Sequence, residues 1–307
     1  MDTIFHACAG LDVHKKTVVA CRRTCDPVGK QTREVRTFST MTADLILLRD
    51  WLREGNCTHV AMESTGQYWK PVYNILESDF ELLVVNAQHV KTVPGRKTDV
   101  KDAEWLAQLL QHGLLRGSFI PPLLQRALRE LTRHRTNFIQ QRTTVSNRIQ
   151  AVMESANIKF ASVASRALGA SGRAILHAIV DGEEDPETLA RMAKGRLREK
   201  HAQLLEALEG RVQDHHRVLL RELLDQFESV DACIARLSAE IKERCAPQEG
   251  VIELLETIPG VGRQTAELII AEVGTDMSRF PTAGHLASWA GVAPGNNESA
   301  GKRLSGR

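Results

Sequence analysis

The sequence lacks the features that mark several specialised classes of protein. It has six cysteines in 307 residues and no Cys-x-x-Cys pair, which argues against structural zinc and favours free thiols in a reducing cytoplasm. No basic N-terminal region leads into an apolar run, and no apolar run approaches the length of a membrane span. The 40 basic and 38 acidic residues nearly cancel, so any nucleic-acid-binding surface must be local. We therefore expect a cytoplasmic protein without a membrane segment.

The first 117 residues show an alternation of strand and helix patterns. Runs rich in β-branched and apolar residues predict strands over residues 5–13, 16–24, 33–40, 58–64 and 80–87. Amphipathic runs predict helices over residues 42–55, closed by Gly55, and over residues 66–78 and about 99–110. The first two strands are separated by a short turn and predict a hairpin. This order of elements indicates a mixed sheet flanked by helices, which is an α/β fold.

Strand signals fade after about residue 121, and two long helical patterns replace them. The first has an apolar seam formed by Leu124, Leu128, Leu131, Phe138, Val145, Ile149 and Val152. The second has a seam formed by Leu219, Leu223, Phe227, Val230, Ile234, Leu237 and Ile241. We expect a coiled-coil-like arm in which the two helices fold back as an antiparallel pair. Ordinary core packing explains both seams without any function.

The first long helix also carries a local excess of arginine. Its basic residues are Arg126, Arg129, Arg133, Arg135, Arg142 and Arg148, and Glu130 is the one acid among them. A solvated helix face usually mixes charges of both signs. The excess is therefore a candidate for contacts with nucleic-acid phosphates, with an ordinary basic surface as an equal alternative.

A second candidate for nucleic-acid binding lies near the end of the sequence, over residues 254–274. An apolar helix end is followed by Pro259, Gly260, Val261 and Gly262, and then by another amphipathic helix. Glycines allow a close approach of the backbone to a partner, and the second helix offers free N–H groups to an anion. This pattern is similar to the helix-hairpin-helix motif that binds DNA backbones. The alternative is a plain corner between two helices.

Four acidic residues form the candidate catalytic site. Asp12 and Glu63 each lie at the end of a strand pattern. Acidic residues are unfavourable in apolar strands, so a carboxylate at this position suggests a function. Asp99 and Asp102 lie three residues apart at the start of a helix pattern, where helix capping is the simpler explanation. If the four meet, their mutual repulsion calls for a divalent cation, and oxygen ligands suit Mg²⁺ or Mn²⁺. Convergence of this kind favours catalysis over capping alone.

Five stretches together give the chain a family resemblance. They are "GLDVHKK", "AMESTGQYW", "GRKTDVKDAEWLAQLL", "IPGVGRQTA" and "LASWAGVAPGNNESAGKRLSGR". The chain resembles the DEDD insertion-sequence transposases of family one-hundred-and-ten, also called bridge-RNA-guided recombinases. The resemblance implies a RuvC-like, ribonuclease-H-type domain over residues 1–117, a helical coiled-coil arm over 118–246 and a transposase domain over 247–307.

The same resemblance implies the roles of individual residues. Asp12, Glu63, Asp99 and Asp102 would be the metal-binding tetrad, and Ser299 the nucleophile, with Ser305 as its rival. Further contacts with nucleic acid are expected from Lys15, Lys16, Lys302 and Arg303, besides the arginines and glycines named above. The implied partners are donor and target DNA, a non-coding guide RNA and other copies of the chain, as a dimer or tetramer. The implied setting is the prokaryotic nucleoid.

The resemblance also implies a further basic segment and helix after Arg307, so that the sequence is expected to be a truncated form. Two other functions stay open on the residues alone. A junction nuclease would use the four acids and water without rejoining strands. A non-catalytic nucleic-acid-binding protein would use only the arginines and the glycine hairpin.

Overall fold

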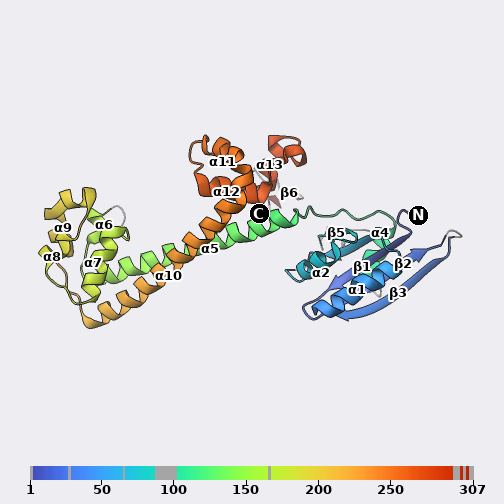
Figure 1. Cartoon of the computed structure of the whole chain (residues 1–307), viewed down its shortest axis with the longest axis horizontal. Helices are drawn as coiled ribbons and strands as arrows, with labels where there is room; N and C mark the ends of the chain where they lie inside the picture. Colours follow the sequence, from blue (N-terminus) through green and yellow to red (C-terminus); the bar gives the residue numbers. More distant parts are fainter. Residues whose placement is uncertain are drawn as a thin grey trace. The chain divides into compact units, whose positions relative to one another are not determined.

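The computed structural model describes residues 3–26, 29–64, 66–86, 102–164 and 167–292, together with the backbone of 298–299 and 302–303. The chain divides into two compact units, Met1–Pro121 and Pro122–Arg307 (Figure 1). The first unit contains a sheet and the second is predominantly helical. Each unit is described here by itself.

A five-stranded sheet forms the centre of the first unit. Its strands are β1 (Ala7–Val13), β2 (Thr17–Cys25), β3 (Gln31–Ser39), β4 (His59–Glu63) and β5 (Glu81–Val85). Their order in the sheet is β3-β2-β1-β4-β5. The first three strands are antiparallel neighbours, whereas β4 is parallel to both β1 and β5. The predicted mixed sheet, including its opening hairpin, is therefore confirmed.

The two faces of the sheet are covered by different helices. One face packs its alternate apolar residues, such as Leu11 and Met62, against α1 (Thr42–Glu54) and α2 (Trp69–Leu76). Gly55 ends α1, as the sequence predicts. The other face packs against α4 (Asp102–Gln111). Successive strand residues point to opposite faces of the sheet. The residues that contact α4 therefore alternate along each strand with those that face α1 and α2.

Helices make up most of the second unit. The long ones are α5 (Leu123–Ser155) and α10 (Asp214–Cys245), and between them in sequence come α6 (Phe160–Val163), α7 (Ala170–Val180), α8 (Pro186–Arg191), η1 (Gly195–Lys200) and α9 (His201–Leu208). After α10 follow η2 (Ala246–Gln248), α11 (Glu249–Glu256), α12 (Arg263–Val273), η3 (Met277–Arg279), α13 (Ala283–Trp289), β6 (Glu298–Ser299) and β7 (Lys302–Arg303).

The helices α5 and α10 lie side by side and run in opposite directions. Leu128 near the start of α5 shares a cluster with Ile241 near the end of α10, whereas Ile149 shares another with Leu220. The antiparallel pair is thus confirmed, but two predicted seam residues are wrong. Leu124 is 80% exposed on α5. Leu219 is 47% exposed, because Leu220 is the first buried apolar residue of α10. A coiled-coil interdigitation along the pair stays a prediction.

A compact helical bundle joins α5 to α10, where the sequence predicts only a connection. Helices α6 to α9 gather at the far end of the pair in Figure 1. They build the largest apolar cluster of the second unit, around Phe160, Ile175, Leu176 and Leu204. We call residues 156–213 the arm tip. No helix in the described part of the chain combines the length and the apolar character needed to cross a bilayer.

Candidate active site

Asp12 and Glu63 occupy matching positions on neighbouring parallel strands. Leu11 on β1 is the register partner of Met62 on β4, and each acid is the next residue of its strand. Register partners on parallel strands direct their side chains to the same face of the sheet. That face is the one under α4, since Gly10, two residues before Asp12, abuts this helix.

The helix α4 approaches this pair of acids with its N-terminal end. Its last residue, Gln111, accepts hydrogen bonds from the backbone N–H groups of Ile4 and Phe5, just before β1 begins. Ala103 and Ala107 lie against Gly10, near the end of the strand. The helix therefore runs opposite to β1, and its first residue, Asp102, lies toward the strand end that carries the acids.

Two small residues of β1, Gly10 and Cys8, make the close contact between α4 and this strand possible. A Cβ atom built on Gly10 would lie 2.3 Å from the backbone nitrogen of Ala107 and 2.4 Å from the carbonyl oxygen of Ala103. The Cys8 thiol, two residues earlier on the same face, lies 3.7 Å from the Ala107 carbonyl oxygen. Burial raises the pKa of the Cys8 thiol to about 12, so it stays protonated at neutral pH. The helix thus sits directly on the backbone of the strand that carries Asp12.

The surroundings of the acids are only partly polar. The Asp12 carboxylate is 26% exposed, and its Oδ2 lies 3.1 Å from Nε2 of His14, a residue that the sequence did not single out. The signal that would have found it is the Asp-x-His spacing on an extended strand, which puts both side chains on one face. Glu104, in the first turn of α4, is instead paired with Arg33 of β3 at 2.6 Å.

The proposed tetrad is not assembled as a metal site among the residues that the structure describes. In that part of the chain, no three His, Cys, Asp or Glu side chains are grouped as ligands of one ion. Asp99 lies outside the described residues, and so does any cap that it forms on α4. Asp102 is the first residue of the helix, where the helix dipole also favours a negative charge. The metal-binding role of the four acids stays a prediction.

Most of the predicted arginine stripe is paired with acids from distant helices. Arg129 donates to the backbone carbonyl oxygens of Ala271 and Glu272 at the end of α12, at 3.1 and 2.6 Å. Arg133 forms a two-bond pair with the Glu272 carboxylate. Arg142 is paired with Asp231 of α10 at 2.7 Å. The local charge excess of α5 is therefore largely neutralised within the second unit.

The position of Arg135 does not suit the phosphate contact that the sequence suggested for it. Its side chain is 4% exposed and its guanidinium lies 2.6 Å from the Glu267 carboxylate, which is 3% exposed. Glu267 also accepts a hydrogen bond from Arg263, and Arg263 is held in turn by Glu249 of α11. Arg135 is better explained as the buried centre of the α5–α12 contact. Arg148, also part of the stripe, is exposed, and Arg126 lies near the start of α5.

The glycine hairpin connects α11 to α12 and is open to solvent. Gly260 has a φ of +88°, which favours glycine, and nothing lies within 4 Å of a Cβ built on it or on Gly262. Gly262 precedes α12 without a side-chain cap.

The remaining predicted residues lie on turns and short strands. Lys15 and Lys16 are exposed in the β1–β2 turn. In the backbone register of β6 and β7, Ser299 lies opposite Lys302 and Glu298 lies opposite Arg303. Ser305 lies outside the described residues.

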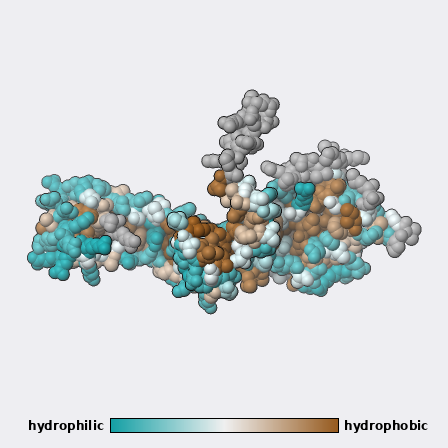
Figure 2. All heavy atoms as spheres, turned by 90° about the horizontal axis from the view of Figure 1, so that it is seen from above, coloured by the Kyte–Doolittle hydropathy of each residue, from teal (hydrophilic) through white to brown (hydrophobic). Residues whose placement is uncertain are grey.

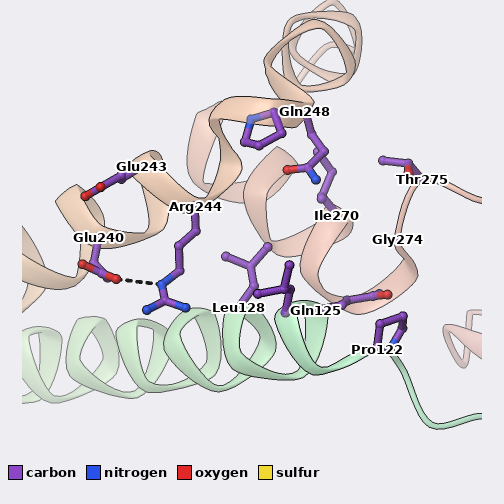
Figure 3. Close-up of a pocket in the computed structure, with 12 residues that line it drawn as sticks. Pro122, Gln125, Leu128, Glu240, Glu243, Arg244, Gln248, Ile270, Gly274 and Thr275 are labelled. Atoms are coloured by element: carbon purple, nitrogen blue, oxygen red, sulfur yellow. Dashed lines mark hydrogen bonds and ion pairs between the residues drawn. The ribbon is translucent and has the colours of Figure 1, made fainter.

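A cavity of about 550 Å³ lies in the second unit where α5, α10 and α12 meet (Figure 3). Leu128 and Ile270 contribute apolar surface, and Arg244 is paired with Glu240 at 2.7 Å. The Gln248 Oε1 atom is buried and has no hydrogen-bond partner among the described residues. The lining also includes Glu243, so it mixes apolar, acidic and basic side chains.

Two models of transposase families match the chain, one in its N-terminal half and one in its C-terminal part. A family model for DEDD transposases of the IS110 type matches residues 9–158, and a model described as "Transposase IS116/IS110/IS902 family" matches residues 252–307. The first match includes β1, β4 and α4, and the second includes the glycine hairpin.

Individual relatives agree with the family models. A "Probable family 20 transposase" of Pseudomonas aeruginosa is 26% identical over 84% of this chain and 68% of its own length. An uncharacterised protein of insertion element IS116 from Streptomyces clavuligerus is 28% identical over 69% of this chain and 60% of its own length. A "Pilin gene-inverting protein" of Moraxella lacunata is 25% identical over 94% of this chain and 73% of its own length. The aligned part of the chain thus spans about two thirds of these relatives. The chain belongs to the IS110 family of DEDD transposases.

Proposed function

We propose that the chain cuts and rejoins DNA strands, using Asp12, Glu63, Asp99 and Asp102 to hold divalent cations and Ser299 as the nucleophile. The observation that carries the proposal is the register of β1 and β4, which sets Asp12 beside Glu63 on one face of the sheet. The N-terminal end of α4, with Asp102, is directed toward the same strand ends. Strand register and helix direction thus support the proposal that acids about ninety residues apart in sequence act at one site.

The chemistry of these donors suits Mg²⁺ or Mn²⁺. Carboxylate oxygens are the hard ligands that both ions prefer, and neighbouring carboxylates without a cation repel one another. A bound ion would supply charge stabilisation for a phosphodiester and lower the pKa of an attacking hydroxyl. His14, hydrogen-bonded to Asp12, would orient that carboxylate toward the strand end. We assign no other role to His14.

The rejoining step separates this proposal from a simple nuclease. Ser299 attack on the phosphorus would break one P–O bond of the phosphodiester and form a serine–phosphate ester, with the serine proton passing to the strand end that leaves as a hydroxyl. The ester keeps the bond energy needed for resealing, in which the new strand's hydroxyl attacks the phosphorus and the serine hydroxyl is regenerated. The name of the Moraxella lacunata relative, which inverts a gene, supports rejoining, because inversion leaves no free ends. Guidance by a non-coding RNA and assembly of several copies complete the proposal through the family resemblance. Neither is needed for the metal site itself.

The test is a strand-transfer assay with guide RNA, donor DNA and target DNA, titrated with Mg²⁺. Asp12→Asn and Asp102→Asn should each lower the cutting rate by at least about a hundredfold, as expected for loss of a ligand that acts on the transition-state charge. Ser299→Ala should abolish the denaturation-resistant protein–DNA adduct formed on a nicked substrate. An adduct that persists in this variant, or maps to Ser305, would remove Ser299 from the role.

Three outcomes distinguish the candidate functions. Rejoined products support the transposase proposal, and metal-dependent cutting with only free ends supports a junction nuclease. DNA binding that is equal with and without chelator, with no cutting by any preparation, supports a non-catalytic binding protein. His14→Ala serves as the matched control for Asp12→Asn, because it removes the hydrogen-bond partner of the carboxylate without removing the carboxylate.

A further inference from the structure

The arm tip carries an exposed run of cations that no prediction from the sequence had included. Lys194, Arg196, Arg198 and Lys200 alternate along the 3-10 helix η1 and its first flanking residue, with Glu199 as the one acid among them. All five side chains are exposed. We call the four cations the tip patch. Seen from above in Figure 2, the end of the second unit that contains the arm tip is mostly hydrophilic.

The tip patch differs from many other basic residues of the second unit in its lack of acidic partners. Among the described residues, Lys194, Arg196 and Arg198 form no ion pair. By contrast, Arg191, three residues before Lys194, is paired with Glu187 at 2.9 Å. Arg133, Arg135 and Arg142 of α5 are likewise paired, as described above. A net charge that the fold leaves unneutralised at one place is available for a partner with negative charge.

The backbone of η1 is held firmly enough to present these charges in a fixed arrangement. Leu197 packs into the apolar cluster of the arm tip. The backbone N–H of Lys194 donates to the Ser171 hydroxyl at 2.9 Å, and Lys200 Nζ donates to the Val163 carbonyl oxygen at 3.0 Å. Side chains three residues apart on a 3-10 helix lie on the same side, so Lys194 and Lys200 flank Leu197 along one side while their own side chains remain exposed. Arg196 and Arg198 are therefore left to face outward.

We infer that the tip patch binds the phosphate backbone of duplex DNA, outside the candidate active site. A 3-10 helix rises about 2 Å per residue, so the patch extends about 12 Å, enough to contact more than one phosphate. Contacts of this type need charge but no base-specific geometry. The inference rests on DNA being the partner of this transposase family, and it is independent of the metal-binding acids. The patch would hold DNA at a distance from the α12 contact, since Arg135 and Ser155 alone are separated by about 30 Å along α5.

The test measures binding of the full chain to a 30-base-pair duplex by fluorescence anisotropy across a range of salt concentrations. The variant Arg196→Gln/Arg198→Gln should bind about tenfold more weakly at low salt. The slope of log Kd against log salt should fall by about two, because each lost phosphate contact removes about 0.9 from it. The charge-preserving variant Arg196→Lys/Arg198→Lys should restore most of the slope.

The matched control removes two charges elsewhere in the second unit. Arg221→Gln/Arg244→Gln affects arginines that already pair with Asp181 and Glu240, so affinity should change less than twofold and the slope should not change. Equal effects of the two double variants would overturn the inference, because they would report only net charge. An unchanged slope in the tip variant would overturn it as well. A larger loss of binding for a duplex RNA than for DNA would overturn the assignment of DNA.

The failure of this inference can be told apart from failure of the proposed function. Asp12→Asn should leave the salt dependence of binding intact while removing cutting. The tip variant should weaken binding while cutting at saturating protein is retained. Loss of cutting in Asp12→Asn with normal binding by the tip variant would leave the proposed function standing and remove the tip patch.

Discussion

The two units pack a helix onto its neighbour in opposite ways. In the first unit, α4 lies on β1 through small residues, so that Gly10 touches the helix backbone near Ala107. In the second unit, α12 lies on α5 through charged side chains, with Arg135 bound to Glu267 and Arg129 bound to backbone carbonyls. The first contact depends on the absence of a side chain, whereas the second adds complementary charge to an apolar cluster that includes Leu128 and Ile270.

This difference shows how the same residue types serve different ends in one chain. Arg133 and Arg135 of the second unit, with the acids they bind, hold helices together and are not free to bind a ligand without cost to the fold. At the end of β1, the carboxylate of Asp12 is 26% exposed and is paired only with the exposed side chain of His14 among the contacts described above. A charged residue is therefore a candidate for function only after its structural partners have been counted.

The largest effect is expected at the backbone contact of the first unit. Gly10→Ala would place a methyl group 2.3 Å from the Ala107 nitrogen, so α4 must move and the free energy of unfolding should fall by at least about 3 kcal/mol. Urea unfolding followed by circular dichroism checks this. The control is Gly250→Ala on α11, where a Cβ meets nothing within 4 Å and the substitution should stabilise by about 0.5 kcal/mol. Equal stability of the two variants would contradict the close contact.

The charged contact of the second unit should respond almost as strongly. Arg135→Ala leaves the buried Glu267 carboxylate unpaired and should lower the free energy of unfolding by about 3–5 kcal/mol. Replacing both residues, as Arg135→Met/Glu267→Leu, should recover most of that loss, because no buried charge remains. Arg133→Ala is the exposed control and should cost at most about 1 kcal/mol. A double variant as unstable as Arg135→Ala would show that the charge itself is needed there.

Asp12 should fall on the functional side of the comparison. Asp12→Asn keeps the size of the side chain and can still bond to His14, so unfolding should change by less than about 1 kcal/mol. A thermal scan of the variant beside the cutting assay measures both quantities on one preparation. A loss above 3 kcal/mol would mean that the carboxylate is structural, like that of Glu267.

The smallest effect concerns thiol reactivity and sharpens the comparison without altering the fold. Burial raises the pKa of Cys8 and of Cys57 to about 12, and that of Cys21 to about 11. At pH 8 these three thiols of the first unit should remain protonated and resist iodoacetamide, whereas the half-exposed Cys233 on α10 should be alkylated. Peptide mass spectrometry identifies the labelled sites. Rapid labelling of Cys8 in the folded protein would mean that α4 opens readily from the sheet.

Much of the first unit could be predicted from the sequence because its signals are local. The hairpin, the Gly55 helix end and the apolar strand over β5 all follow from residues adjacent in the chain. The register that sets Asp12 beside Glu63 could not be derived in this way. It depends on pairing between strands fifty residues apart, which the alternation of apolar residues does not specify.

The second unit was harder to predict because its decisive partners are remote. The acids that neutralise Arg133 and Arg135 lie more than 130 residues later on α12. A count of charges along α5 alone therefore suggests a free basic face. The seams failed at Leu124 and Leu219 for a related reason, because several faces of an amphipathic helix can pass as the core until its neighbour is known.

The contacts of α5 also determine how late in synthesis this helix can complete its packing. Arg129 bonds to the carbonyl of Ala271, 142 residues further on, so this bond waits until α12 has been synthesised. At about 5–20 residues per second, the ribosome needs roughly 7–30 s to cover that interval. For all of that time α5 lacks α12, and for most of it α5 also lacks the complete α10. Most of the stability of a helix in a protein comes from such tertiary packing. The nascent protein therefore passes through an interval in which Leu128 and its neighbours are open to chaperones and proteases.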